Sequence, residues 1–196
     1  MQLSIDNLET NDIYKLVSET LSPRPIAWIS SKSKENILNL APFSYFTPLS
    51  SSPATFIVSI GHKADGSPKD TLKNLRDTKK CSIVIATTEQ LQDMQNSANP
   101  LNYNQSEFKE YNIKTTTIKK EYPDVPTNSK VVFFCEYKQE VKLDGSKTIP
   151  VIVELKEIFI DDLLFTSKDK LRVQYNQQIA RVGAGYYALG EKLEVK

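Results

Sequence analysis

Three consecutive residues, Lys69, Asp70 and Thr71, stand where the sequence predicts the start of a helix. Asp70 is a natural N-cap residue, and the leucines that follow recur at helical spacing. A helix start offers an anion free backbone N–H groups and the positive end of the helix dipole, to which Lys69 adds an ammonium group and Thr71 a hydroxyl. These donors are typical of a phosphate site, although an ordinary capped surface helix has the same pattern.

The two predicted strands before this helix suit a flat ring. A Pro-Arg-Pro sequence at residues 23–25 stiffens the start of a strand over residues 26–31. In the next strand, small Ala41 and Pro42, which has no N–H, open the backbone to a planar ring. Side-chain hydrogen bonds are available from two polar residues of the same strand, Asn39 and Ser44. Strands and helix start together predict a pocket for a flat, phosphorylated ligand.

The aromatic residues of these strands have two interpretations. Trp28, Phe43, Tyr45 and Phe46 either line the ring of a ligand or fill the core, which is the usual place of large aromatic side chains. The sequence leaves both interpretations open.

The remaining reactive side chains form no catalytic set. The single histidine, His62, lies in a loop before the predicted helix, either at the rim of the pocket or in solvent. Cys81 and Cys135 each lie inside an apolar run, so we expect buried free thiols and no nucleophile and base pair. The acidic pair at residues 161–162 has no third ligand at a useful spacing, so no metal site is predicted.

Composition narrows the class of protein. The 196 residues are 39% hydrophobic, enough for one well-filled domain over residues 1–196. Lys and Arg total 25 against 24 Asp and Glu, so the net charge of +1 gives no field that would hold a nucleic acid or an anionic membrane. The N-terminus lacks the basic and apolar regions of a signal peptide, and no stretch approaches the ~20 apolar residues of a membrane span. We expect a cytoplasmic protein that binds neither nucleic acid nor membrane.

Short apolar runs rich in β-branched and aromatic residues predict a mainly β fold. Bounded by Ser, Pro, Asn and Gly, they are typical of strands, and they comprise residues 26–29, 43–46, 56–58, 83–85, 131–135 and 149–160. Asp144-Gly145 is a hairpin signal between the last two runs. Between residues 88 and 111, apolar anchors such as Met94 and Phe108 predict one or two short helices. The pattern favours a β-barrel-like domain decorated by short helices.

Four sequence blocks resemble those of the flavin reductase-like family of FMN-binding split barrels, to which flavoredoxin-like proteins belong. In chain order the blocks are PRPIAWISS, NLAPFSYF, FIVSIG and KDTLKNL. The segment from Arg181 to Ala188 resembles the family's closing Arg-x-Gly-x-x-x-Tyr element, so the resemblance covers roughly residues 21–189. Arg181 and the glycines after it either form part of a donor site over the flavin or make a tight bend under packed tyrosines.

The resemblance implies a six-stranded split barrel of Greek-key type, and a homodimer with FMN, rather than FAD, at each of two sites near the subunit interface. Matching positions place the isoalloxazine and ribityl contacts on Trp28, Ile29, Ser30, Ser31, Asn39, Ala41, Pro42, Phe43 and Ser44. Ser59 would lie on the neighbouring strand, and Lys69 and Thr71 would meet the phosphate, with Asp70 organising the turn. Many members continue the fourth strand into an Asn-containing segment that holds the flavin; here Thr87 or Thr88 would substitute.

The function implied by the resemblance is an NAD(P)H-dependent flavin reductase, in which hydride passes from nicotinamide to flavin N5 while the protein holds the ring. Two other functions stay open: a non-enzymatic FMN-binding electron carrier that serves a protein partner, and a barrel that binds another ligand without flavin. The partners implied are a nicotinamide cofactor, a second copy of the chain, and a redox protein or oxygenase.

Overall fold

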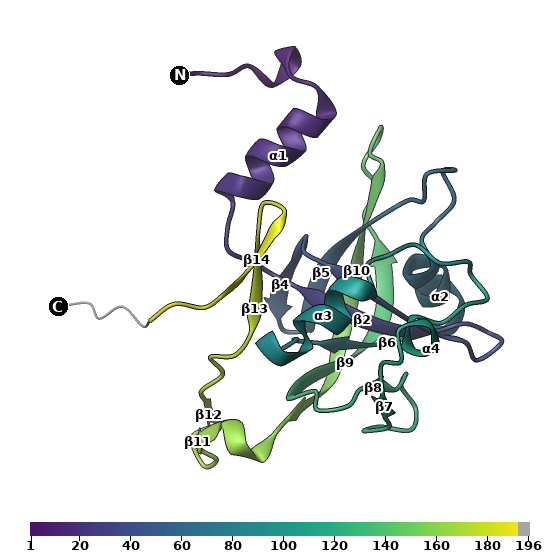
Figure 1. Ribbon diagram of the computed structural model, residues 1–196, viewed down its shortest axis with the longest axis vertical. Helices are drawn as coiled ribbons and strands as arrows, with labels where there is room; N and C mark the ends of the chain where they lie inside the picture. The colour runs from purple at the N-terminus through teal and green to yellow at the C-terminus, as the bar shows by residue number, and fades with distance from the viewer. Residues whose placement is uncertain (192–196) are drawn as a thin grey trace.

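A curled antiparallel sheet forms the centre of the computed structural model, which describes residues 1–191 (Figure 1). Its seven strands pair in the order β3-β2-β6-β9-β10-β5-β4. Their bounds are β2 (Ala27–Lys32), β3 (Leu38–Phe43), β4 (Phe46–Ser51), β5 (Ala54–Gly61), β6 (Lys80–Val84), β9 (Val131–Glu140) and β10 (Thr148–Ile160). Most residues of the predicted apolar runs fall in these strands, and the mainly β prediction is confirmed. Residues 192–196 of the predicted domain lie outside the described residues.

The two edge strands of this sheet, β3 and β4, are joined by Ser44 and Tyr45 alone. So short a connection holds the two edges close together, and the sheet therefore curls into a barrel. In agreement, β3 also contacts β5, the neighbour of β4. The sequence predicted a single strand over residues 43–46 and a six-stranded barrel; the bend at Ser44 and Tyr45 divides that run between two strands, so the sheet has seven.

Successive residues of each strand pack on opposite faces of the curled sheet. Ile29 belongs to a buried cluster that takes residues from both edges of the sheet, together with Leu72 and Leu75 of α2 (Asp70–Thr78), and this cluster fills the concave side. Its neighbour Trp28 belongs to a second cluster on the outer face, which Met94 helps to cover. The helix that carries Lys69 at its start is therefore fixed by two leucines in the concave core.

Within residues 1–191, short helices and three small sheets surround the barrel. The helical segments are η1 (Ile5–Asn7), α1 (Thr10–Thr20), α2, η2 (Thr88–Gln90), α3 (Leu91–Asn96), α4 (Glu107–Glu110) and η3 (Asp162–Leu164). The remaining strands are β1 (Arg24–Pro25), β7 (Thr115–Thr116), β8 (Val125–Pro126), β11 (Phe165–Ser167), β12 (Arg172–Val173), β13 (Ile179–Val182) and β14 (Gly185–Ala188). Strands β1, β13 and β14 form a three-stranded sheet, and α1 stands away from the barrel beside it (Figure 1). The other two small sheets are the two-stranded pairs β7-β8 and β11-β12.

Several local predictions are confirmed. Gly145 has a φ of +78° in the turn that joins β9 to β10, as the hairpin signal predicted. Short helices fill part of residues 88–111, with Met94 and Phe108 buried. Cys81 and Cys135 are buried free thiols that lie opposite each other in the β6–β9 pair. Among residues 1–191, every helix is too short or too polar to cross a membrane.

Candidate functional site

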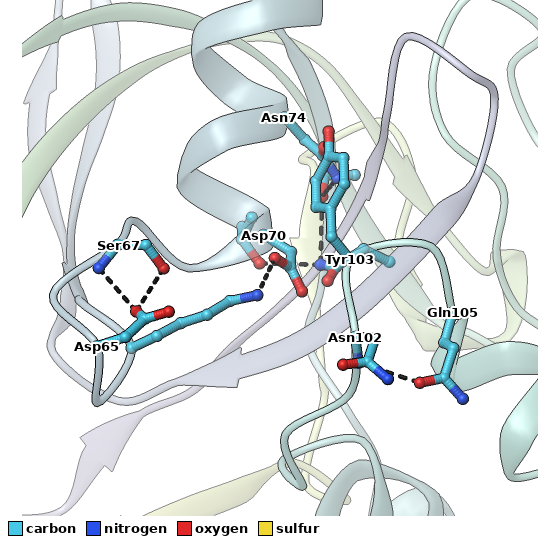
Figure 2. A network of polar contacts seen from close by, with 11 residues as sticks. Asp65, Ser67, Asp70, Asn74, Asn102, Tyr103 and Gln105 are labelled. Carbon is cyan, nitrogen blue, oxygen red and sulfur yellow. Dashed lines mark hydrogen bonds and ion pairs between the residues drawn. The ribbon is translucent and has the colours of Figure 1, made fainter.

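The predicted phosphate site lies where α2 begins. The N-cap of α2 is Lys69 and Asp70 is the first helical residue, so the prediction of Asp70 as the cap was wrong by one position. The reason is an ion pair, which Figure 2 draws as a dashed line at Asp70: its carboxylate lies 2.5 Å from Lys63 Nζ. Within residues 1–191 the cap makes no side-chain hydrogen bond. The N–H groups of the first helical turn have no intrahelical acceptor, which leaves them for an anion.

This helix start opens onto a cavity of about 570 Å³. Strand β3 forms one wall, the loop of residues 62–65 a second, residues 97–101 between α3 and α4 a third, and Glu107 of α4 a fourth. The residues of the predicted cofactor site that the cavity brings together are Asn39, Ala41, Lys69, Asp70 and Thr71.

A buried network of hydrogen bonds fixes the Thr71 hydroxyl. Thr71 Oγ1 accepts a hydrogen bond from Asn39 Nδ2 at 2.9 Å. The amides of Asn39 and Asn74 both donate to Ser31 Oγ, at 3.3 and 3.1 Å, and the Tyr103 hydroxyl donates to Asn74 Oδ1 at 3.0 Å (Figure 2). Among residues 1–191 the Thr71 hydroxyl hydrogen has no acceptor of its own. The network therefore holds this hydroxyl as a donor at the cavity wall.

Lys69 supplies the positive charge of the site. Its side chain is exposed, and its Nζ lies 5.8 Å from the centre of the Phe43 ring. In the described part of the chain no carboxylate lies within ion-pair distance of Lys69, whereas Lys63 is paired with Asp70. A free ammonium group, a fixed hydroxyl and an uncapped helix start are the donors that a phosphate monoester requires.

Glu107 is a residue of the cavity that sequence reasoning missed. Its side chain is 5% exposed, and its Oε2 accepts a hydrogen bond from the Leu40 N–H at 2.8 Å. This N–H lies on the edge of β3 that has no neighbouring strand among residues 1–191. Burial raises the pKa of this carboxyl from 4.5 to about 7, although the bond from Leu40 opposes the rise. The only sequence signal was its place beside the predicted anchor Phe108, which indicates a helix but not what the neighbouring glutamate faces.

His62 lies at the rim of the same cavity. Its Nδ1 is 3.0 Å from the carbonyl oxygen of Lys147, so the ring is tethered to the segment before β10. Of the two places that the sequence left open for this residue, the structure gives the rim.

The residues from Trp28 to Ser31 lie in β2, behind the cavity wall. Trp28 is fully buried, and its Nε1 donates to Ser97 Oγ at 2.8 Å, which ties residues 97–101 to the sheet. Ile29 lies in the concave core, and Ser30 Oγ donates to the carbonyl oxygen of Asp124 at 2.6 Å. These side chains lie behind the β3 wall and support the cavity from there. Their direct contact with a cofactor stays a prediction.

The aromatic residues with two interpretations divide between core and surface. Trp28, Phe43 and Phe46 are buried in the core clusters, whereas Tyr45 is 38% exposed. The core interpretation therefore describes three of the four, and Tyr45 is open to a ligand or a partner.

Ser44 and Ser59 line a second cavity, of about 450 Å³, together with Arg24 and Tyr45. Arg24 is 6% exposed, and its terminal nitrogens donate to the carbonyl oxygens of Ser18 and Gly183. Its Nε has no partner among residues 1–191. In the chain, Pro42 and Phe43 lie between Ala41, which lines the first cavity, and Ser44, which lines the second. Pro42 is opposite Trp28 in the β2–β3 pair, and Phe43 is buried.

Two other predicted features are engaged in local structure. Arg181 Nε donates to the Gly183 carbonyl at 3.2 Å, and its guanidinium lies 4.2 Å from the centre of the Tyr186 ring. Gly183 has a φ of +52° in the β13–β14 hairpin, so this segment makes the tight bend that was one of its two interpretations. Thr87 starts η2 through a capping box with Gln90, and Thr88 is exposed.

The chain belongs to the flavin reductase like domain family, whose model matches residues 20–172. A protein of Aquifex aeolicus is 29% identical over 100% of both chains, and one of Halalkalibacterium halodurans is 29% identical over 74% of this chain and 69% of its own. The resemblance of the four sequence blocks to this family is therefore confirmed.

Solved structures show the same fold. The nitrilotriacetate monooxygenase component B of Bacillus cereus has a TM-score of 0.88 at 23% identity, with 100% of this chain and 98% of that chain covered. Flavoredoxin of Desulfovibrio vulgaris has a TM-score of 0.77 at 14% identity, covering 100% and 97%. An FMN-binding protein of Thermus thermophilus has a TM-score of 0.79 at 14% identity, covering 100% of both chains. The split-barrel prediction is confirmed by the solved structures. By its family, the chain is a flavin-related oxidoreductase.

Proposed function

We propose that the protein binds FMN in the cavity between α2, β3 and residues 97–101, with the phosphate at Lys69 and Thr71. The observation that carries this proposal is the buried bond between Asn39 and Thr71, which fixes a hydroxyl donor beside a free ammonium group and an uncapped helix start. Such donors suit a terminal phosphate monoester, the group in which FMN ends, and they therefore favour FMN over FAD. The single methyl group of Ala41 keeps the β3 wall open to a flat ring.

We propose further that NADH or NADPH is the electron donor, so that the protein is an NAD(P)H-dependent flavin reductase. Flavin, when bound, supplies the redox chemistry at its N5 atom. The residues of this chain bind the phosphate, orient the ring and exclude water from it. Lys69 and Thr71 hold the phosphate end, and the 97–101 segment, anchored by the Trp28 bond to Ser97, forms a wall beside the ring.

Two measurements on the purified protein test this function. FMN is added to apoprotein while the quenching of its fluorescence is followed, and then NADH or NADPH is added without oxygen while the flavin absorbance is recorded. We expect quenching followed by bleaching with at least one nicotinamide, and steady oxidation of that nicotinamide with excess FMN in air. Bound flavin that neither nicotinamide bleaches would instead identify an electron carrier, and absence of quenching would leave a barrel for another ligand.

We also propose a homodimer, located in the cytoplasm, that passes electrons on to a redox protein or an oxygenase. The motivation for the dimer is the apolar surface around α1, where Tyr14 is 55% exposed, Val17 38% and Leu21 69%. A second copy of the chain would cover these side chains. The cytoplasm supplies reduced nicotinamides and keeps the thiols of Cys81 and Cys135 reduced.

A further inference from the structure

Glu107 places a buried carboxyl inside the cavity that we assign to FMN. It lines the same cavity as Lys69 and Thr71, at 5% exposure. In the described part of the chain, its carboxylate receives one hydrogen bond from another residue, the N–H of Leu40. A buried carboxylate with one neutral donor is weakly stabilised in its charged form.

The charged groups around Glu107 do not compensate for this burial. Lys63 is already paired with Asp70, and the exposed Lys69 lies at the end of the cavity where the phosphate would bind. In the 62–65 loop, the His62 ring is tethered to a carbonyl oxygen, and the Asp65 carboxylate accepts two hydrogen bonds from Ser67. The walls formed by β3 and by residues 97–101 contribute uncharged residues. The pKa of Glu107, raised by burial to about 7, agrees with this environment.

Binding of a phosphorylated ligand would disfavour the charged carboxylate in two ways. A ring and ribityl chain that fill the cavity remove the water that still solvates Glu107, and the phosphate brings two negative charges into the same enclosure. Both effects raise the pKa of Glu107 further. The protonated carboxyl, unlike the carboxylate, can also donate a hydrogen bond to a ligand oxygen.

We propose that Glu107 takes up a proton from solution when FMN binds, so that the affinity for flavin is coupled to pH through this single carboxyl. The proposal rests on FMN binding in this cavity, the function proposed above. In the balanced step, apoprotein with an ionised Glu107, FMN and one proton give the complex with a neutral Glu107. No other bond forms or breaks.

Isothermal titration calorimetry measures the proton directly. FMN is titrated into apoprotein at about pH 7.5 in buffers that differ in ionisation enthalpy, and the slope of the observed enthalpy against that value gives the protons exchanged. We expect uptake of about half a proton by the wild type, because at that pH the carboxyl is mostly ionised when free and mostly neutral in the complex. Glu107→Gln should take up none. Glu110→Gln removes an exposed carboxyl from the same helix and should behave as the wild type.

The pH dependence of affinity gives a second readout. The Kd of wild-type protein for FMN should rise about fivefold between about pH 7 and about pH 8.5, whereas that of Glu107→Gln should stay nearly constant. Measurement above neutral pH keeps the phosphate of FMN, whose second pKa is about 6, in one ionic form. Glu110→Gln should follow the wild type.

The outcomes separate this inference from the proposed function. If neither protein quenches FMN at any pH, FMN binding itself is refuted. If FMN binds but the wild type takes up no proton or releases one, the role of Glu107 is refuted and the proposed function stands. Equal proton uptake by wild type and Glu107→Gln refutes it as well. The wild-type proton number needs no variant, so absence of uptake refutes the role of Glu107 even if Glu107→Gln folds poorly.

Discussion

At the scale of single residues, the proposed phosphate site takes its charge and its fixed hydroxyl from two different residues. Lys69 carries a free positive charge on an exposed side chain, whereas Thr71 is a buried hydroxyl held by Asn39. Removal of the charge should weaken FMN binding without affecting a flavin that has no phosphate, whereas removal of the hydroxyl should also disturb the buried network.

Lys69→Ala should raise the Kd for FMN about 10- to 100-fold, because a charge-assisted hydrogen bond contributes about 1.5–3 kcal/mol. Fluorescence titration with FMN and, in parallel, with riboflavin measures the effect. Lys120→Ala, a change at an exposed lysine, is the matched control and should leave both affinities unchanged. An equal loss for FMN and riboflavin would contradict a phosphate role for Lys69.

Thr71→Val keeps the volume of the side chain but leaves the buried Asn39 amide without its acceptor at 2.9 Å. We expect the free energy of unfolding, measured with urea, to fall by about 1–3 kcal/mol. FMN binding should weaken as well. Thr71→Ser retains the hydroxyl and should bind FMN within about threefold of the wild type. If Thr71→Val binds as tightly as Thr71→Ser, the hydroxyl is not a ligand of the phosphate.

Glu107 also predicts how stability changes with pH in the absence of ligand. Its pKa is about 7 in the folded protein against 4.5 when exposed, so the folded state binds more protons between these values. Stability contributed by this group is therefore complete at low pH and falls as pH rises towards 7, by about 3 kcal/mol at most. Thermal melts should show Glu107→Gln equal to the wild type near pH 4 and more stable near pH 8. A constant difference across this range would show that burial does not perturb the carboxyl.

Residue types predicted the helix start of the candidate site better than its buried carboxyl. Lys69 and Thr71, which line the cavity, could be singled out because a helix start has a local signature that three residues carry. Glu107 was missed because it lies in a polar segment, and its place in the cavity is held by a hydrogen bond from Leu40, which is distant in the sequence. The N-cap was misplaced by one residue because Lys63, seven positions before Asp70, pairs with it across a loop.

At the scale of elements, one hydrogen bond joins residues 97–101, a wall of the cavity, to the barrel. Trp28 Nε1 of β2 donates to Ser97 Oγ, just after α3. Trp28→Phe and Ser97→Ala each break this bond. Each change leaves the other partner buried without the bond, and Trp28→Phe also leaves a small void. Each should therefore lower the free energy of unfolding by about 1–3 kcal/mol.

The double variant should lose less than the sum of the two single changes, with a coupling of about 1 kcal/mol, since both changes remove the same bond. Urea unfolding at a constant m-value measures the cycle. Ser52→Ala, at an exposed position of the β4–β5 turn, serves as the control and should be additive with Trp28→Phe. Additivity of Trp28→Phe and Ser97→Ala would show that the bond contributes nothing.

Most strands of the barrel could be predicted, because short runs of β-branched and aromatic residues with turn residues between them are a local signal. The division of residues 43–46 at Ser44 and Tyr45 could not be predicted, since it arises from closure of the sheet. Helix α1 was not predicted either. In the described part of the chain its cap, Glu9, makes no side-chain hydrogen bond, so no cap residue in the sequence marks its start. Ser18 is its one buried residue, so it packs little on the barrel. The organisation as a single domain stays a prediction.

At the scale of the whole molecule, the apolar surface around α1 predicts the oligomeric state. Light scattering after size exclusion should give a mass of twice the 22.2 kDa chain. Leu21→Glu places a charge where Leu21 is 69% exposed and should shift the population towards the monomer. Leu163→Glu, at a leucine that is 86% exposed on η3, is the matched control and should stay dimeric. A wild-type mass of one chain at micromolar concentration would refute the dimer.

The order of strands in the barrel leaves β3 and β4 at its edges, and each of these strands contains a proline, Pro42 and Pro48. Proline has no N–H, and the ladder of β4 is shifted again between Pro48 and Ser50. On β3 the carboxylate of Glu107 already occupies the N–H of Leu40. Neither edge strand therefore presents an uninterrupted row of backbone N–H groups with which a strand of another molecule could pair. This protects the chain against edge-to-edge aggregation at high concentration.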